Sequence, residues 1–289
     1  LVEGRNKFHI TLNLNREKGR EIFKKLVKRS DVVIESFKFG EADKMGIGYR
    51  QLKEINESII YAAINTYGQF GQEVCKEPDY DIVDQARSTV MAVTGEAEFD
   101  PDVPEEYKVP LREDNWMGWY TGGAWAAYAI LLALYWRSYT GKGQFIDISP
   151  PETLLRHANY NIQYYHEAGK IVPRVGPYDP AVFAYTVVRA KDRHVFIAGY
   201  SDPNWQGLTT MIGRPDLFDK YPTPRERLIF ENQIVMRKAI QEWAETKTAD
   251  EILDLAMKHN LDESKIGTVV VGKVYSPCLL YTSDAADEL

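Results

Sequence analysis

The first half of the sequence alternates short apolar segments with amphipathic ones, and this order constrains the fold more than any other feature. Residues 8–14, 31–35 and 58–64 have the length and composition of strands, and residues 144–149 add another. Between the first two segments, residues 16–29 place their apolar side chains on one helical stripe. Strands that alternate with helices predict an α/β domain with a parallel sheet.

Two more helices are expected between these strands. Residues 49–56 have a helical pattern, and residues 81–93 place apolar side chains near helical spacing before Gly95 ends the helix. Residues 96–110 are acidic and rich in proline, which is typical of a surface loop. The first half is therefore interpreted as an α/β domain that carries a surface loop.

The longest uncharged run lies between Asp114 and Arg137 and raises the question of a membrane span. A span needs about 20 consecutive apolar residues, whereas the first half of this run contains Asn115, Thr121 and several glycines. The apolar part is closer in length to an interior helix. We therefore predict a buried core helix that ends near Tyr139, and no membrane partner.

The second half begins after a cluster of glycine and proline, which predicts a linker. A hairpin and then helices are expected beyond it, at 182–189 with 194–199, and at 203–212, 223–246 and 249–259. The predicted division is a large domain at 1–168, a linker at 169–180, a small α+β domain at 181–265, and a return segment with an aperiodic tail at 266–289. Residues 275–289 resemble translated adaptor or frameshifted sequence, so they are excluded from the fold prediction.

Composition excludes several classes of function. The net charge of -7 and the pI near 5.4 argue against a nucleic-acid partner, which requires a basic face. Cys75 and Cys278 offer neither a disulfide framework nor metal-ligand spacing, which fits a reducing cytoplasm. The histidines show no paired metal spacing, so no metal is predicted. The sequence also lacks the glycine patterns of dinucleotide and P-loop sites and the G-x-S-x-G elbow of serine hydrolases.

A series of short motifs points to one family. The motifs in the first half are DVVIESFKFG at 31–40, KMGIG at 44–48, YGQ at 67–69, DYD at 79–81 followed by Gln85, and VTGE at 93–96. Further along the chain they are TGKGQ at 140–144, Asp147, RVG at 174–176, SDPNW at 201–205 and IG at 212–213. In order and spacing they resemble the class III CoA-transferases, which include formyl-CoA and carnitine CoA-transferases. The resemblance covers roughly residues 5–265.

The resemblance implies a Rossmann-like large domain, a smaller domain reached through a linker, and a dimer of two interlocked rings. Family members begin with a further strand and helix and end with a segment that returns to the large domain. We expect both to be missing from this sequence.

In the family, CoA lies along the large domain. Carried over position by position, the contacts fall at Leu12, Asn13, Leu14, Asn15, Ser36, Phe37, Lys38, Lys44 and Tyr80. Lys38 and Lys44 would suit the CoA phosphates, because a lysine ammonium is a good point charge for them. The alternative is that both are solvated surface lysines. Phe37 would stack on adenine or fill the core.

The family reaction uses an aspartate carboxylate that attacks the acyl-CoA thioester to give a mixed anhydride. The CoA thiolate then forms an aspartyl-CoA thioester, and an acceptor acid reverses the steps. Counted back from Thr140 by the family's spacing, the aspartate position falls on Trp119, which cannot form an anhydride. Asp114 is a candidate replacement but requires a five-residue shift. Asp81 matches an acidic position near the family's active site and would equally serve as a helix N-cap.

Three functions therefore stay open. The first is a CoA-transferase that moves CoA from an acyl-CoA to a carboxylic acid. The second is a non-catalytic CoA-binding or scaffolding subunit of a heteromeric transferase, which Trp119 favours. The third is an acyl-CoA racemase, which is less favoured because Tyr80 stands where those enzymes place a histidine. The expected assembly is a homodimer or a heteromer with a related subunit, in the cytoplasm.

Overall fold

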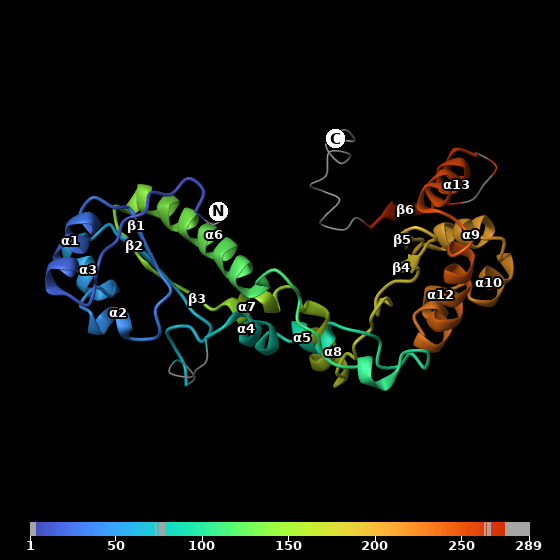
Figure 1. Cartoon of the computed structure of the whole chain (residues 1–289), viewed down its shortest axis with the longest axis horizontal. Coiled ribbons are helices and arrows are strands. Elements are labelled where there is room, and N and C mark those ends of the chain that lie inside the picture. Colours follow the sequence, from blue (N-terminus) through green and yellow to red (C-terminus); the bar gives the residue numbers. More distant parts are fainter. Residues whose placement is uncertain (1–3, 73, 75–78, 263, 265–266, 275–289) are drawn as a thin grey trace. The chain divides into compact units, whose positions relative to one another are not determined.

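The computed structural model describes residues 4–72, 74, 79–262, 264 and 267–274 (Figure 1). The chain divides into two compact units. One comprises residues 1–92 and 111–172, and the other comprises residues 93–110 and 173–289. Residues 93–110 thus pack with the second unit although they precede the predicted linker. Cys75 and Cys278 lie outside the described residues, as does the tail from 275.

The first unit is built on a parallel sheet, as the strand and helix alternation predicts. Its strands are β1 (Val32–Glu35), β2 (Ile60–Ile64) and β3 (Phe145–Ile148), in the spatial order β1-β2-β3. Val32 pairs with Ile60, and Tyr61 pairs with Phe145. The central strand β2 is almost wholly buried, as expected for a parallel strand with both faces covered.

Helices cover both faces of this sheet. The side chains of β2 alternate between the faces, so that Ile60 and Ala62 pack toward α6 (Met117–Thr140) while Tyr61 and Ala63 face the opposite side. The cluster on that opposite side includes residues from α1 (Glu17–Val27) and α3 (Tyr49–Ile55). The result is a three-layer α/β unit that confirms the predicted fold class. Its shorter helices are α2 (Glu41–Lys44), α4 (Asp81–Arg87), α5 (Val90–Val93), α7 (Pro150–Leu155) and α8 (Asn159–Ala168).

Residues 8–14 are not a strand, so the prediction for this segment was wrong. The segment has no regular structure, and Phe8 and Ile10 are exposed. An alternating pattern makes a strand only where a neighbouring strand completes the hydrogen-bond ladder. Within the described part of the chain, no strand pairs with this segment.

The helix predicted at 81–93 is interrupted. It forms α4 and α5, because Thr89 adopts a left-handed backbone conformation with φ of 67° and breaks the helical hydrogen-bond series. The other predicted helices of this unit are confirmed with small shifts of their ends.

The prediction that the long apolar helix is buried holds for only one face. Gly118, Gly122 and Ala126 are among its buried residues, and they let α6 pack closely against the neighbouring elements. Its other face exposes large apolar side chains, namely Trp125, Tyr128, Leu131, Leu132, Tyr135, Trp136 and Tyr139. Periodicity could not predict this, because both faces of the helix are apolar in sequence. Among the described residues, no helix is both long enough and apolar enough to cross a membrane.

The second unit has an antiparallel sheet packed against helices. Strands β4 (Tyr185–Arg189) and β5 (His194–Ala198) form the predicted hairpin, and β6 (Val270–Lys273) pairs with β5. Its core includes Trp205, Met236 and Ile240. The helices are α9 (Asp202–Met211), α10 (Pro215–Lys220), α11 (Pro224–Arg227), α12 (Phe230–Ala244) and α13 (Ala249–Leu261). The helix predicted at 223–246 is thus divided into α11 and α12, and α10 was not predicted.

Candidate functional site

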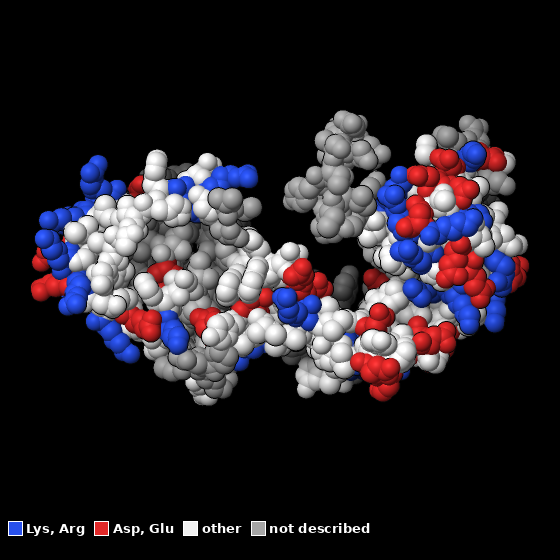
Figure 2. All heavy atoms as spheres, viewed as in Figure 1, with Lys and Arg blue, Asp and Glu red and all other residues white. Residues whose placement is uncertain are grey.

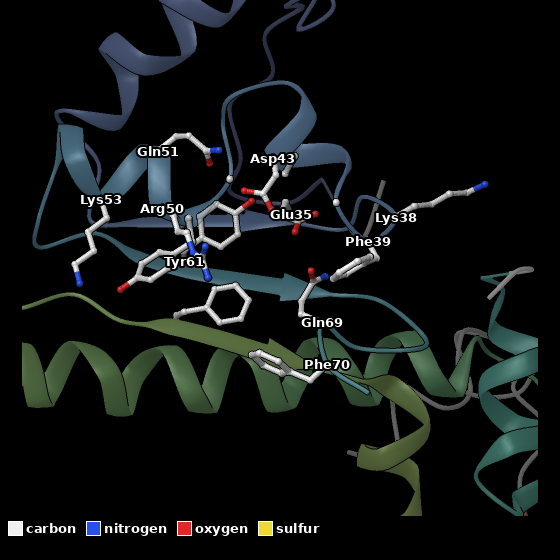
Figure 3. A pocket seen from close by; sticks show the side chains of 15 residues that line it. Glu35, Lys38, Phe39, Asp43, Arg50, Gln51, Lys53, Tyr61, Gln69 and Phe70 are labelled. Atoms are coloured by element: carbon white, nitrogen blue, oxygen red, sulfur yellow. The ribbon is translucent and has the colours of Figure 1, made fainter. Parts of the chain in front are cut away.

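The first unit contains a pocket of about 850 Å³ that lies over one face of the sheet, from Tyr61 and Phe145 near the beginnings of β2 and β3 to the loops that follow the carboxyl ends of β1 and β2 (Figure 3). Parallel α/β sheets bind ligands at the carboxyl ends of their strands, because the loops there are free to surround a molecule. The lining comes from β1 and the loop after it, from α2 and α3, from β2 and the loop after it, and from β3. It consists of Glu35, Lys38, Phe39, Gly40, Ala42, Asp43, Gly48, Tyr49, Arg50, Gln51, Lys53, Tyr61, Gln69, Phe70 and Phe145.

Aromatic rings form one wall of the pocket. The ring centroid of Phe145 lies 5.5 Å from that of Tyr49 and 5.9 Å from that of Tyr61. Phe70 meets Phe145 edge-on, with centroids 6.3 Å apart. Such a wall offers apolar surface to a planar ring.

Charged groups line the rest of the pocket. Lys38, Arg50 and Lys53 contribute positive charge, and the side chain of Lys38 extends outward from the loop after β1 (Figure 3). Burial raises the pKa of Glu35, although its carboxylate accepts hydrogen bonds from the backbone N–H of Phe37 and from Tyr61. Burial, followed by the charge of Glu35, raises the pKa of the Tyr61 hydroxyl. Around the pocket, Lys and Arg gather over the end of the unit where α1, α2 and α3 lie (Figure 2).

A smaller cavity of about 250 Å³ shares Glu35 and Tyr61 with the larger one. Leu14, Ser36 and Phe37 line this smaller cavity. Four of the predicted CoA contacts therefore line two adjoining cavities, since Lys38 lines the larger one. Leu14 and Phe37 also pack against the core cluster under the sheet.

The remaining predicted CoA contacts are less closely grouped. Asn13 and Asn15 are exposed and belong to one turn, in which the Asn15 N–H donates to the Asn13 side chain over 3.0 Å. Leu12 is half-buried in the same segment. Lys44 is exposed at the end of α2, and Tyr80 is exposed immediately before α4. Neither lines the two cavities as the structure describes them.

Asp81 lies at the junction of α4 and α6 and is 2% exposed. Its Oδ1 accepts hydrogen bonds from the backbone N–H of Gly118 over 2.8 Å and of Trp119 over 3.3 Å. Its Oδ2 accepts a bond from the Gln85 side chain over 2.7 Å. Asp81 is thus a helix cap, but it caps α6 and not the helix on which it lies. A carboxylate is stabilised there by the unpaired N–H groups and the positive end of the helix dipole.

Trp119, to which the motif spacing assigns the family's aspartate position, presents an aromatic surface. Its indole stacks on that of Trp116, with ring centroids 5.0 Å apart and planes 11° from parallel. Trp116 and Trp119 are 54% and 48% exposed. The left-handed conformation of Trp116, with φ of 51°, directs the chain into α6 and places the rings together.

Asp114 lies in the loop before α6 and is exposed, 3.8 Å from the Arg112 guanidinium. The neighbouring residue Glu113 is fixed to α4, because its backbone N–H and C=O bond to the Gln85 side chain over 2.7 and 3.0 Å. Gln85 therefore links the Asp81 carboxylate to the segment that carries Asp114.

The sequence analysis missed a second carboxyl group at the same junction. Asp84 is fully buried, and its Oδ1 lies 2.6 Å from the hydroxyl oxygen of Thr66, which also hydrogen-bonds Asp79. Burial, together with the charges of Asp79 and Asp81, raises the pKa of Asp84 to about 7. The spacing of Asp81 and Asp84 on one helix gave a signal, since residues three apart share a helix face.

Asp147 is the penultimate residue of β3 and is held by the loop after β2. Its Oδ2 accepts the backbone N–H of Gln69 over 2.8 Å, and burial raises its pKa. Gly68 has φ of +67° and approaches this carboxylate so closely that a Cβ would lie 3.2 Å from Oδ2. In the described residues, no group of three or more His, Cys, Asp or Glu side chains is placed to hold a metal ion.

Comparison with known proteins decides the family. The family described as CoA-transferase family III matches residues 1–283. The chain belongs to this family. The resemblance drawn from the motifs is thereby confirmed.

Relatives of this CoA-transferase family III chain include enzymes with different named substrates. It is 32% identical to succinyl-CoA:mesaconate CoA-transferase of Haloarcula marismortui, over 87% of this chain and 61% of that protein. It is also 32% identical to formyl-CoA:oxalate CoA-transferase of Streptomyces coelicolor, over 89% of this chain and 64% of that one. A third relative, 28% identical, is the succinyl-CoA–L-malate CoA-transferase beta subunit of Chloroflexus aurantiacus. The chain thus spans less than two thirds of the length of these relatives.

Solved structures agree with the fold. A CAIB/BAIF family protein from Brucella suis has a TM-score of 0.77 at 27% identity, over 96% of this chain and 69% of that one. The Mycobacterium tuberculosis protein Rv3272 has a TM-score of 0.79 at 22% identity, over 98% of this chain and 71% of that one.

Proposed function

We propose that this chain takes part in the transfer of CoA from an acyl-CoA to a carboxylic acid. The observation that carries the proposal is that four predicted CoA contacts, Leu14, Ser36, Phe37 and Lys38, line two adjoining cavities in a family III chain. The named reactions of the relatives support the same class of chemistry.

The pocket offers a place for the nucleotide end of CoA. The aromatic wall of Tyr49, Tyr61 and Phe145 suits the adenine ring. Lys38 and Lys44 would neutralise phosphates, and Arg50 and Lys53 add positive charge at the same end of the unit. The predicted CoA contacts at Leu12, Asn13, Asn15 and Tyr80 belong to the same proposal.

The reacting group is the open part of the proposal. In the family reaction, a carboxylate oxygen bonds to the thioester carbon and the CoA thiolate leaves. The thiolate then attacks the aspartyl carbon and releases the donor acid. An indole cannot form these bonds, so Trp119 cannot be the nucleophile. Asp114 is the carboxylate nearest in sequence, and the Gln85 bonds to Glu113 anchor its segment at the junction.

The second candidate is a non-catalytic CoA-binding or scaffolding subunit. The Trp116 and Trp119 stack favours it, because it replaces the reacting carboxylate with an aromatic surface. The relative from Chloroflexus is named as a beta subunit, which supports a heteromeric arrangement. Racemase activity is the least favoured, because Tyr80 stands where those enzymes place their proton-transfer histidine.

The exposed face of α6 supports an assembly with a second chain. Its tyrosines, tryptophans and leucines form an unusually apolar surface for a helix of a folded unit. A second copy or a related subunit would cover this face, in a homodimer or a heteromer. The cytoplasm stays the predicted location.

An exchange assay separates the first two candidates. The purified chain is incubated with labelled CoA, an acyl-CoA and a pool of carboxylic acids, and hydroxylamine traps any enzyme thioester. Exchange that Asp114→Asn abolishes, while the exposed Asp102→Asn control retains it, would establish catalysis by this chain. Exchange that appears only with Trp119→Asp, or only with a related subunit, would instead establish the scaffolding role. A chain that neither exchanges CoA nor binds it would overturn both.

A further inference from the structure

The junction of α4 and α6 holds three carboxyl groups, Asp79, Asp81 and Asp84, and the proposed function uses none of them. Both oxygens of Asp81 act as acceptors, because they receive two backbone N–H groups and one side-chain amide. Asp79 and Asp84 share the hydroxyl of Thr66. This sharing determines where a proton lies.

A threonine hydroxyl carries a single proton and can donate only one hydrogen bond. Its oxygen lies within bonding distance of Asp79 Oδ1 and, at 2.6 Å, of Asp84 Oδ1. Two ionised carboxylates cannot both be satisfied by this proton, so one of the carboxyl groups must donate to the Thr66 oxygen. Asp79 Oδ1 also accepts the backbone N–H of Thr66 over 3.3 Å, which identifies it as the acceptor. The proton therefore belongs to Asp84.

Burial supports the same assignment. Asp84 is 0% exposed, and its Oδ2 has no hydrogen-bond partner in the part of the chain that the structure describes. A buried, unpaired oxygen is far less costly on a neutral acid than on a carboxylate. The pKa of Asp84, raised to about 7 chiefly by burial, agrees with a proton held at neutral pH.

The charged groups around Asp84 are few. Asp79 and Asp81 disfavour its ionisation, and Arg87 favours it from a position over the Tyr67 ring. The first turn of α6 has no acidic residue, and the basic residue of this helix, Arg137, is in its last turn. The charged residue of α7, Glu152, is exposed and lines a different cavity. Glu113, in the loop before α6, is exposed.

Asp84 also touches the start of α6 directly. A Cβ placed on Gly118 would lie 2.7 Å from the Asp84 Cβ, 2.9 Å from its Oδ2 and 3.1 Å from Asp81 Oδ1. The two carboxyl groups therefore meet at one backbone position, one residue before Trp119. If Asp84 ionised, its charge would oppose the Asp81 carboxylate at the point where that carboxylate caps α6.

We propose that Asp84 is a positioning residue: the proton that it shares with Asp79 through Thr66 lets the ionised Asp81 hold the N-terminus of α6, which carries the Trp119 position of the site. When the proton is lost, the cap loosens and the site is no longer held in place. The activity readout of this inference rests on the proposed function, but its titration readout does not.

The titration is measured on the full chain with ¹³C-labelled aspartate side chains, by nuclear magnetic resonance from pH 4 to 9. One carboxyl carbon is expected to titrate near pH 7, to be absent from Asp84→Asn, and to persist in the matched surface variant Asp219→Asn. Asp79→Asn leaves Asp84 in place and is expected to move the titration midpoint of the Asp84 carboxyl carbon to lower pH, because a like charge is removed. The inference is overturned if every aspartate carbon titrates below pH 5.

The second readout is the pH profile of CoA exchange, or of CoA binding if the chain is a scaffold. In the wild-type protein, the rate of CoA exchange, or the affinity for CoA, should fall about tenfold between pH 6 and pH 8, because the protonated fraction of a group with a pKa near 7 falls by that factor. In Asp84→Asn the same rate or affinity should change less than twofold over this pH range, because the amide cannot ionise. Identical profiles in the two proteins would exclude a positioning role for Asp84. Absence of both exchange and binding would count against the proposed function alone, since the titration still decides where the proton lies.

Discussion

The two parts of the proposed site differ in how well their residues suit the roles that the family resemblance assigns to them. The two adjoining cavities beside β1 and β2 are lined by the predicted contacts Leu14, Ser36, Phe37 and Lys38. The junction of α4 and α6 holds Asp81 against the start of α6, with an indole at Trp119 and a second buried carboxyl group at Asp84. We therefore expect CoA binding and the transfer reaction to be separable in this chain, and each can be tested by itself.

The largest effect is expected at the junction and depends on pH. The pKa of Asp84 rises from 3.8 in the unfolded chain to about 7, so the folded state binds more protons between these values. Stability should therefore fall as pH rises from about 4 to 7 and stay low above 7. Relative to Asp84→Asn, we expect the free energy of unfolding of the wild-type protein to fall by about 3 kcal/mol between about pH 4 and pH 7. Urea unfolding at several pH values measures this free energy in both proteins. Curves of stability against pH that run parallel for the two proteins would contradict the prediction.

Gly118→Ala should be the next most damaging change. The added methyl would overlap Asp84 and displace the cap, which we expect to cost about 1–3 kcal/mol. Gly123→Ala on the same helix is the matched control, because no atom lies within 4 Å of its added methyl. It should gain up to about 1 kcal/mol from helix propensity. Equal unfolding midpoints for the two variants would show that the junction is not tightly packed.

At the pocket, Lys38→Ala should weaken CoA binding about tenfold, or about 1.4 kcal/mol, through loss of a phosphate contact. Lys142→Ala removes an equal charge from the turn between α6 and β3 and should leave affinity unchanged. Calorimetric titration with CoA measures both constants. If the two variants bind alike, Lys38 is a solvated lysine, and the pocket is not where the phosphates lie.

The smallest effect on stability is expected on the exposed face of α6. Leu132→Arg should change the free energy of unfolding by no more than about 0.5 kcal/mol, because the side chain is exposed. It should nevertheless lower the apparent mass in solution, since the charge would oppose a second chain on this face. Analytical sedimentation of the wild-type protein and of Leu132→Arg measures this apparent mass. An unchanged mass would show that the face is not an interface.

Much of the first unit could be predicted because its strands are apolar runs bounded by turns. The strands predicted at 31–35 and 58–64 match β1 and β2 to within two residues at each end. A parallel strand that is buried on both faces is a continuous apolar run, which is easy to recognise in a sequence. Residues 8–14 have an equally clear alternation but no pairing strand, and pairing is not visible in a local pattern.

The junction was harder to predict because its contacts are distant in sequence. Thr66 and Asp84 are 18 residues apart, and Asp81 and Gly118 are 37 apart. Sequence reasoning placed Asp81 as a possible helix cap, but could not tell that the helix was α6. The stack of Trp116 on Trp119 depends on a left-handed backbone at Trp116, which no local signal indicates for a bulky residue.

The most direct test of the account is whether the wild-type chain binds CoA at the two adjoining cavities beside β1 and β2, since both candidate functions depend on it. Calorimetric titration of the full chain with CoA, together with a titration of the Lys38→Ala, Lys44→Ala double variant, measures this binding. The account predicts saturable binding by wild type at a single site and a loss of about a hundredfold in the double variant. Wild-type binding that is absent, or that the double variant retains in full, would contradict it.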